Sequence, residues 1–370
     1  MKEKIYLSPP DLRGNEQDLV QSVFQSNWIA PMGPMLDEFE LKLANLVEVS
    51  NAVALNSATA AIHLGLQVLG VKKGDKVLCS SFTFVASVNP VTYLGAIPVL
   101  IDAEVDTWNI CPVLLEQAIV EETKKGEKPK ALVLVHGYGT PAKVDEILAI
   151  TKKYNILVLE DAASALGASF KQQAVGTFGD VGVYSFNGNK IITTSGGGML
   201  VSNHQKYIQE ARYLSRQAKE NTPDYQHNQI GYNYGLSNVL AAIGVAQLEL
   251  LPEFLIARKK NHQYYKKALE KKELVFLEPH VNTESNYWLT CVLFPSNSLK
   301  EKVRLALASE HIESRSLWKP MHQQTIYNEC SFYKNGVSDD LFERGLCLPS
   351  GSLLTEDNLA RVCKVILENC

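Results

Sequence analysis

The segment NILVLEDAA (residues 155–163) runs through four consecutive apolar residues to an acidic pair and two alanines. A short, unbroken apolar run is typical of a β-strand covered on both faces, as in a parallel sheet between two layers of helices. The segment KALVLVHGYG (130–139) has the same form and ends at a histidine and two glycines. We therefore expect both segments to be strands of one parallel sheet, with polar side chains where each strand stops.

Outward from these two segments, short apolar runs alternate with longer helical ones. This alternation predicts an α/β fold with a mostly parallel sheet. The other predicted strands are NAVALNS (51–57), GDKVLCSSFT (74–83), IPVLIDA (97–103) and VGVYSFN (181–187). The predicted helices between them are ATAAIHLGLQVLG (58–70), VASVNPVTYLG (85–95) and KVDEILAITKKY (143–154), with a loop at KQQAVGTFGD (171–180).

A domain boundary is predicted near Leu251 and Pro252, where an apolar helix gives way to a basic one. Residues 1–250 would form a large domain and residues 251–370 a small α+β domain. The predicted elements around and beyond the boundary are the helices NVLAAIGVAQLELL and PEFLIARKKNHQYYKKALEKKE, the strand SNYWLTCVLFP (285–295), and the helices LKEKVRLALASEHI (299–312) and EDNLARVCKVILENC (356–370).

Composition excludes several classes of protein. The 370 residues are 46% hydrophobic and carry a formal net charge of -4, so the basic excess of a nucleic-acid-binding surface is absent. The seven cysteines are widely spaced without a C-x-x-C pair, which indicates reduced thiols and no metal site. The N-terminus lacks a signal-peptide pattern, and we expect no apolar run of the roughly 18 residues that a membrane helix needs. We expect a soluble cytoplasmic protein.

Polar residues follow several predicted strands, at the sheet edge where α/β proteins bind ligands. Ser57, Ala58 and Thr59 open a helix directly after a strand, where free N–H groups suit a phosphate. Ser57 or Thr59 would equally serve as an ordinary helix cap. Asp161 closes the strand 155–163, where a buried carboxylate requires a cation or hydrogen bonds, although it too could cap a helix.

The stretch YSFNGNKIITTSGGGML (184–200) contains one lysine, Lys190, between an aromatic strand and a glycine run. The glycines match neither a phosphate-binding P-loop nor a dinucleotide-binding loop. A lysine amine with a lowered pKa becomes a nucleophile that can form a Schiff base. The alternative is an ordinary surface lysine.

Taken together, these groups are the ones that pyridoxal phosphate (PLP) needs. The phosphate needs an anchor, the aldehyde needs a lysine, and the pyridine nitrogen needs a carboxylate to stay protonated. An aromatic residue packed on the ring would complete the site, and Phe82 and Phe84 follow another strand end.

In these segments and their order, the chain resembles the nucleotide-sugar aminotransferases of the DegT/StrS type, which are PLP enzymes of fold type I. The similarity covers nearly the whole chain and implies an aspartate-aminotransferase-like fold. That fold has a large domain with a mostly parallel seven-stranded sheet and a small C-terminal α+β domain. The most specific segments are LNSATAAIHLGL, SSFTFVASVNPV, LEDAASALGAS, YSFNGNKIITTSGGGML and YNYGLSNVLAAIGVAQLE.

The resemblance also implies roles for individual residues. Lys190 would join the cofactor aldehyde and move protons, and Asp161 would pair with the pyridine nitrogen. The other implied cofactor contacts are Ser57, Ala58, Thr59 and Ser185 at the phosphate, Phe84 on the ring face, Ser164 beside the ring hydroxyl, and Asn233 at the phosphate of the neighbouring subunit, which requires a homodimer. The implied substrate contacts are Trp28, Ile29, Asn187, Arg315, Trp318 and His322.

The implied reaction moves the amino group of L-glutamate, released as 2-oxoglutarate, to a UDP-linked 4-keto-6-deoxy sugar. The resemblance favours C4 of UDP-2-acetamido-4-keto-2,4,6-trideoxyglucose, which gives a bacillosamine-type 4-amino sugar. Three alternatives stay open: a perosamine-type 4-aminotransferase using a GDP-sugar, a dTDP-sugar 3-aminotransferase, and a sugar-nucleotide binder without activity. Gly235 stands where relatives usually carry Arg, which leaves one expected contact to the nucleotide in doubt.

Overall fold

The computed structural model describes residues 3–370. Its centre is an eight-stranded sheet in which all pairs are parallel except those that β9 makes with β1 and with β8. The predicted mostly parallel α/β sheet is confirmed, with β14 from the C-terminal part as an added edge strand. In spatial order the strands are β1 (Asn51–Leu55), β9 (Gly198–Ser202), β8 (Val181–Ser185), β5 (Leu157–Asp161), β4 (Ala131–Val135), β2 (Lys76–Ser80), β3 (Ile97–Ile101) and β14 (Phe332–Tyr333).

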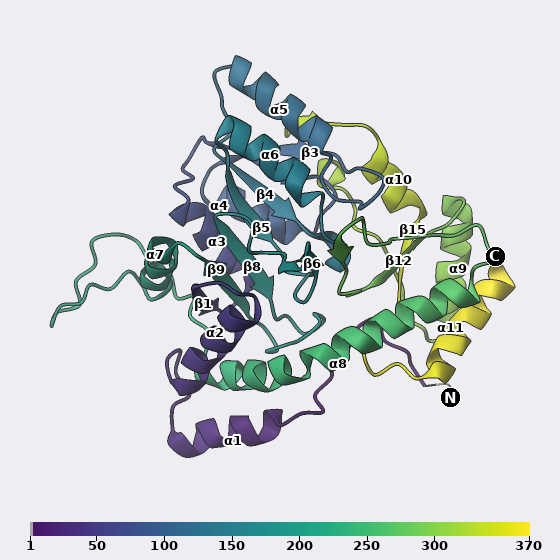
Figure 1. Cartoon of the computed structure of the whole chain (residues 1–370), viewed down its shortest axis with the longest axis horizontal. Helices are drawn as coiled ribbons and strands as arrows, with labels where there is room; N and C mark the ends of the chain where they lie inside the picture. The colour runs from purple at the N-terminus through teal and green to yellow at the C-terminus, as the bar shows by residue number, and fades with distance from the viewer. Residues whose placement is uncertain (1–2) are drawn as a thin grey trace.

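Helices cover both faces of this sheet, as Figure 1 shows. One face packs against α3 (Ala58–Val68), α4 (Asn89–Tyr93) and α7 (Gln205–Ser215). The other face packs against α2 (Pro34–Leu46) and α8 (Asn238–Ala268) at one end, and against α5 (Pro112–Lys124) and α6 (Val144–Tyr154) at the other. The central strands are therefore buried on both sides, which explains their unbroken apolar sequences.

The C-terminal part has its own apolar core beside a four-stranded antiparallel sheet. The N-terminal segment joins this core, because Ile5 bridges to Ile312, and the C-terminus lies there in Figure 1. The elements are β10 (Val275–Phe276), β12 (Thr290–Leu293), β15 (Gly345–Leu348), β13 (Arg315–Ser316), α9 (Asn297–Ser309), α10 (Val337–Arg344) and α11 (Glu356–Asn369).

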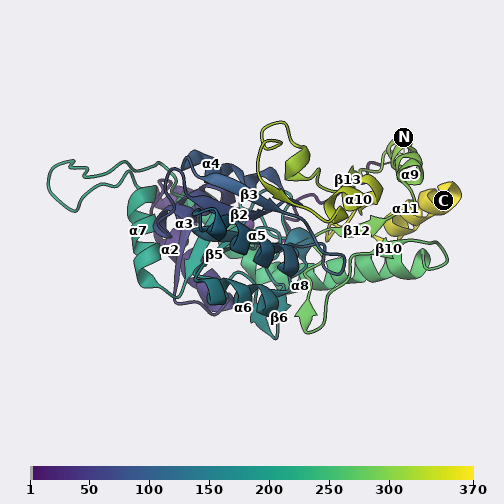
Figure 2. The same ribbon diagram turned by 90° about the horizontal axis from the view of Figure 1, so that it is seen from above.

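Two smaller features complete the chain. A three-stranded sheet consists of β11 (Thr283–Glu284), β6 (Ser169–Phe170) and β7 (Gln173–Ala174), so part of the predicted loop 171–180 is a strand. Helix α1 (Glu16–Ser26) packs on α8. The loop between α7 and α8 projects from one end of the molecule in Figure 2.

Two helix predictions need correction. The segment 85–95 is a short 3₁₀ turn (Val85–Ser87) followed by α4, not one helix. The two helices predicted on either side of Pro252 are a single helix of 31 residues, α8. A proline inside a helix removes one backbone hydrogen bond, yet Leu251 and Phe254 beside it are buried in the core of the large sheet, and this packing holds the helix together. The domain boundary near residue 251 stays a prediction and would fall inside α8.

Helix α8 also tests the expectation that the chain has no segment able to cross a membrane. It is the one helix among residues 3–370 that is long and apolar enough to cross a membrane, so the expectation of no such run was wrong. Half of its most apolar window is buried inside the molecule, as in the core helix of a soluble protein. Length and composition are therefore weak evidence for a membrane span here.

Candidate active site

A cavity of about 960 Å³ opens at the carboxyl ends of the central parallel strands. Its walls come from the ends of β4, β5 and β8, from the start of α3, and from the N-terminal and C-terminal segments. Because the strands run in parallel, residues far apart in sequence stop at the same edge of the sheet. The cavity thus gathers Asp161, Lys190 and residues 57–59, which the sequence singled out near strand ends.

Lys190 lies in the loop after β8, with its side chain in the cavity. Its Nζ donates to Ser164 Oγ at 2.8 Å and lies 3.9 Å from the centroid of the Trp288 ring. Burial lowers the pKa of Lys190 from 10.5 to about 8, although the Asp161 carboxylate opposes this shift. At this pKa about one-tenth of the amine is unprotonated at pH 7, so the group can act as a nucleophile or a base.

Asp161 ends β5 and is 5% exposed. Its Oδ2 accepts from Ser87 Oγ at 2.6 Å, and its Oδ1 accepts from the Ala163 N–H at 3.1 Å. Burying a carboxylate is unfavourable unless hydrogen bonds or a cation compensate. Because this carboxylate still lines the cavity, it can also face a cationic group of a bound molecule.

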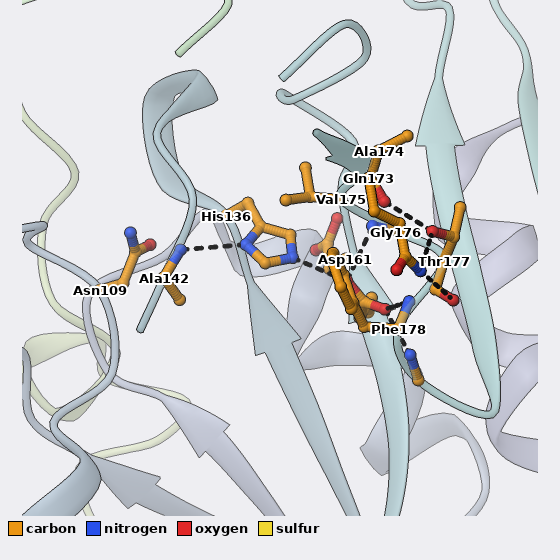
Figure 3. A network of polar contacts seen from close by, with 12 residues as sticks. Asn109, His136, Ala142, Asp161, Gln173, Ala174, Val175, Gly176, Thr177 and Phe178 are labelled. Atoms are coloured by element: carbon orange, nitrogen blue, oxygen red, sulfur yellow. Dashed lines mark hydrogen bonds and ion pairs between the residues drawn. The ribbon is translucent and has the colours of Figure 1, made fainter. Parts of the chain in front are cut away.

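A buried polar network anchors the strand ends behind Asp161 (Figure 3). His136 Nδ1 accepts from the Ala142 N–H at 3.1 Å, and its Nε2 lies 3.0 Å from Glu160 Oε2. The other acceptor positions of Glu160 take the N–H groups of residues 176, 178 and 179. This pattern suits a neutral ring with its hydrogen on Nε2. His136, one of the strand-end residues noted in the sequence, therefore fixes β4 to β5 and does not line the cavity.

The start of α3 forms another part of the cavity wall. Ser57 caps the helix by accepting the Ala60 N–H at 3.1 Å, and it also lines the cavity, so its predicted contact with the cofactor stays a prediction. The first amides of the helix, on Ala58 and Thr59, lie in the cavity wall, where a helix offers them no carbonyl partner. A Cβ on Gly198 would lie 2.4 Å from Ala58 N, so only glycine lets β9 approach this closely. An anion can bind these amides.

The three groups that line the cavity, Lys190, Asp161 and the first amides of α3, fit PLP. The amides of α3 could hold its phosphate, Asp161 its ring nitrogen, and Lys190 its aldehyde carbon. Ser185 and the half-exposed Phe84 also line the cavity, where they would contact the phosphate and the ring.

Three predicted substrate residues also border the cavity: Asn187, Arg315 and Trp318. Arg315 is mostly exposed and is paired with Glu313 Oε1 at 3.0 Å. Trp318 stacks on Tyr138, with ring centroids 3.9 Å apart. The C-terminal part thus contributes a cation and an aromatic wall.

The other predicted residues lie outside this cavity. His322 contacts Ser81 Oγ and an oxygen of Asp339, both at 2.8 Å. Trp28 and Ile29 are about half exposed near the start of α2, and Asn233 is exposed on the segment before α8. Phe82, the other aromatic considered for the ring, is buried away from solvent.

Sequence reasoning missed the roles of Ser87, Trp288 and Tyr138. Ser87 was visible within SSFTFVASVNPV, but nothing local indicated that it faces Asp161, 74 positions away. Trp288 lies in a segment predicted only as a strand, and its contact with Lys190 depends on how the two parts of the chain pack. Tyr138 belongs to the HGYG strand end, where its ring joins the wall made by Trp318.

Comparison with known proteins agrees with this site. A family model described as the DegT/DnrJ/EryC1/StrS aminotransferase family matches residues 10–367. EpsN of Bacillus subtilis, whose name assigns it to the PLP-dependent aminotransferases, is 49% identical, covering 99% of this chain and 96% of its own. A GDP-perosamine synthase of Escherichia coli O157:H7 is 35% identical, covering 97% and 96%.

Among solved structures, the PLP form of Spr1654 from Streptococcus pneumoniae, named as a sugar aminotransferase, superimposes with a TM-score of 0.91 at 27% identity over the full length of both chains. The expected aminotransferase fold and its cofactor are therefore confirmed, and the chain belongs to the PLP-dependent DegT/DnrJ/EryC1/StrS aminotransferase family.

Proposed function

We propose that this aminotransferase transfers the amino group of L-glutamate to C4 of UDP-2-acetamido-4-keto-2,4,6-trideoxyglucose in the cytoplasm. The observation that carries the proposal is the meeting of Lys190, Asp161 and the first amides of α3 in one cavity with room for a large substrate. The sugar itself rests on the sequence segments that resemble bacillosamine-type enzymes.

Different residues of the chain hold the cofactor and move protons. PLP, when bound, supplies an aldehyde for amine exchange and a ring that withdraws electrons from the reacting carbon. Asp161 keeps the ring nitrogen protonated, and its bond to Ser87 fixes the direction of the carboxylate. The Ala58 and Thr59 amides hold the phosphate.

Lys190 carries the proton transfers. Its Nζ takes the proton from the carbon that bears the glutamate amine, and in the second half-reaction returns a proton to C4 of the sugar. The lowered pKa of about 8 suits an amine that must both accept and release a proton near neutral pH. Ser164 Oγ, at 2.8 Å, orients the amine between these steps.

A GDP-linked perosamine-type reaction is the second candidate. It is favoured by the 35% identity to a GDP-perosamine synthase over nearly the whole chain. The two reactions differ in the nucleotide and the sugar, and sugar choice depends on a few contacts at the cavity mouth.

One assay tests both the chemistry and the substrate. Purified protein with PLP is incubated with glutamate and a panel of UDP-, GDP- and dTDP-linked keto sugars, and the aminated product is identified by NMR. We expect the UDP-4-keto sugar to be the best substrate and Lys190→Ala to abolish turnover while cofactor still binds. Normal turnover by Lys190→Ala would refute the role of Lys190. A preference for the GDP-sugar would select the second candidate, and no turnover with any sugar would favour an inactive binder.

We also propose a homodimer in which Asn233 reaches the partner's site. This is supported by its exposure beside the projecting loop, where Tyr225 and Ile230 are more than 80% exposed. Asn233→Ala and Lys190→Ala should each be inactive alone. Mixed together under conditions that allow exchange, they should regain about a quarter of the wild-type activity, because each hybrid dimer has one intact site. No recovery in confirmed hybrids would contradict the shared site.

A further inference from the structure

Trp288 contacts both the amine of Lys190 and the backbone that carries it. Its ring lies 3.9 Å from Lys190 Nζ, and its indole N–H donates to the Asn189 carbonyl at 2.7 Å. Ser8 Oγ donates to the same carbonyl at 2.9 Å. The loop after β8 is therefore held from outside the large sheet, by the N-terminal segment and by the segment before β12.

Both of these contacts lead to one buried arginine. Arg258, in the middle of α8, is 1% exposed. Its guanidinium donates to the Trp288 carbonyl at 2.6 Å, to Ser8 Oγ at 3.2 Å and to the Ser350 carbonyl at 3.3 Å. None of these acceptors is a carboxylate. Burial lowers the pKa of Arg258 to about 10, with Asp11 opposing the shift.

Stability alone is a weak explanation for this arginine. A buried cation without a directly bonded carboxylate is unfavourable, and an apolar side chain of similar volume is often at least as stable at such a position. What the guanidinium adds is a fixed orientation of the groups that accept its hydrogen bonds. Two of its three acceptors, on Ser8 and Trp288, belong to residues that bond to Asn189. The four residues therefore form a closed ring of hydrogen bonds that includes the backbone directly before Lys190.

We propose that Trp288 and Arg258 are positioning residues for Lys190: Trp288 covers the amine and fixes its loop, and Arg258 acts through Trp288 and Ser8. The proposal rests on the proposed role of Lys190 as the reacting amine. Arg258 never touches the cavity. Its function is to keep the indole face over Nζ so that water does not surround the amine.

This ring of hydrogen bonds predicts how the pKa of Lys190 responds to substitutions at Trp288 and Arg258. Burial is the largest cause of its lowered pKa, so loosening the cover admits water and raises the pKa toward 10.5. Trp288→Phe keeps an aromatic face but loses the bond to Asn189 and leaves a gap. Arg258→Met keeps the bulk of the side chain but loses all three hydrogen bonds. Both variants should shift the pKa upward, whereas a residue of purely structural importance would lower stability without moving it.

The test is competitive acetylation of full-length, cofactor-free protein across pH 6 to 11, with the Lys190 peptide quantified by mass spectrometry. Wild type should show a labelling midpoint near pH 8. Trp288→Phe and Arg258→Met should each move it up by about one pH unit, a tenfold change in unprotonated amine at neutral pH. Arg258→Lys, which still can donate to the Trp288 carbonyl, should recover part of the shift.

Arg212→Met is the matched control. Arg212 is paired with Glu40 and bonds to the Ala52 carbonyl away from the cavity, so its loss should reduce stability and leave the midpoint near 8. Folded Arg258→Met with a wild-type midpoint would overturn the proposal. If Arg258→Met does not fold, Trp288→Phe decides: a raised midpoint supports the positioning role and an unchanged one overturns it. The role of Lys190 in turnover is judged separately by the Lys190→Ala assay.

Discussion

Replacing Lys190 with methionine should stabilise the cofactor-free protein at neutral pH, and this gain should shrink as the pH rises. Lys190 has a pKa of about 8 in the folded chain and 10.5 as its ordinary value. Between these pH values the unfolded chain binds more protons at this group than the folded chain does, so stability rises with pH. The charge on Lys190 therefore disfavours folding at neutral pH, and this cost is lost as the pH rises through the window.

The magnitude follows from the two pKa values. Linkage gives a cost of about 3 kcal/mol at pH 7 and about 1 kcal/mol or less at pH 10. Methionine has a similar length and no charge, so the variant is free of this cost at both pH values. It also loses the bond to Ser164 and the contact with Trp288, about 1 kcal/mol together. The part of this loss that depends on the ammonium charge is already contained in the folded-state pKa, so only the remainder, nearly constant with pH, is added to the linkage cost.

The assay is urea unfolding of both proteins at one protein concentration, at pH 7 and at pH 10. The advantage of Lys190→Met over wild type should shrink by about 2–3 kcal/mol between the two pH values. Lys259→Met, at an exposed position on α8, should differ from wild type by the same amount at both. A Lys190→Met advantage that does not change with pH would refute the claim that burial lowers the pKa of Lys190.

Three further substitutions test the surroundings of the site. Ser87→Ala removes the bond to Asp161 and should weaken PLP binding about tenfold or more, as measured by fluorescence titration. The control Ser22→Ala on α1 should bind PLP like the wild type. Equal affinities of Ser87→Ala and wild type would show that Asp161 does not need this bond. Glu160→Gln places an amide against backbone N–H donors and should lower the free energy of unfolding by about 3 kcal/mol in urea, so wild-type stability would contradict the anchoring role. Phe84→Leu should weaken PLP binding by about 0.5–1.5 kcal/mol if its ring stacks on the cofactor, and unchanged binding would exclude that contact.

The sequence predicted the sheet well because its strands are buried on both faces. The runs ending at Val135 and Asp161 carry no polar interruption, and the structure pairs them in parallel. Position at a strand end was enough to bring Asp161 and Lys190 into one cavity, since parallel strands stop at a common edge.

What the sequence could not predict depends on packing between distant segments. The cover over Lys190 comes from Trp288, 98 positions later, and no spacing rule links the two. Pro252 suggested a helix end, because a proline usually breaks a helix, but burial of its neighbours on both sides outweighed one lost hydrogen bond. Residues placed by resemblance on exposed segments, such as Trp28 and Asn233, lie away from the cavity within one chain.

The unbroken course of α8 has a mechanical consequence. This single helix packs into the core of the large sheet at one end and into the C-terminal core at the other, and Arg258 lies between the two. Because α8 is continuous, a rigid-body movement of the C-terminal core relative to the large sheet would have to bend this helix. Within α8, the turn that lacks the Pro252 amide is the place where such a bend would cost least free energy.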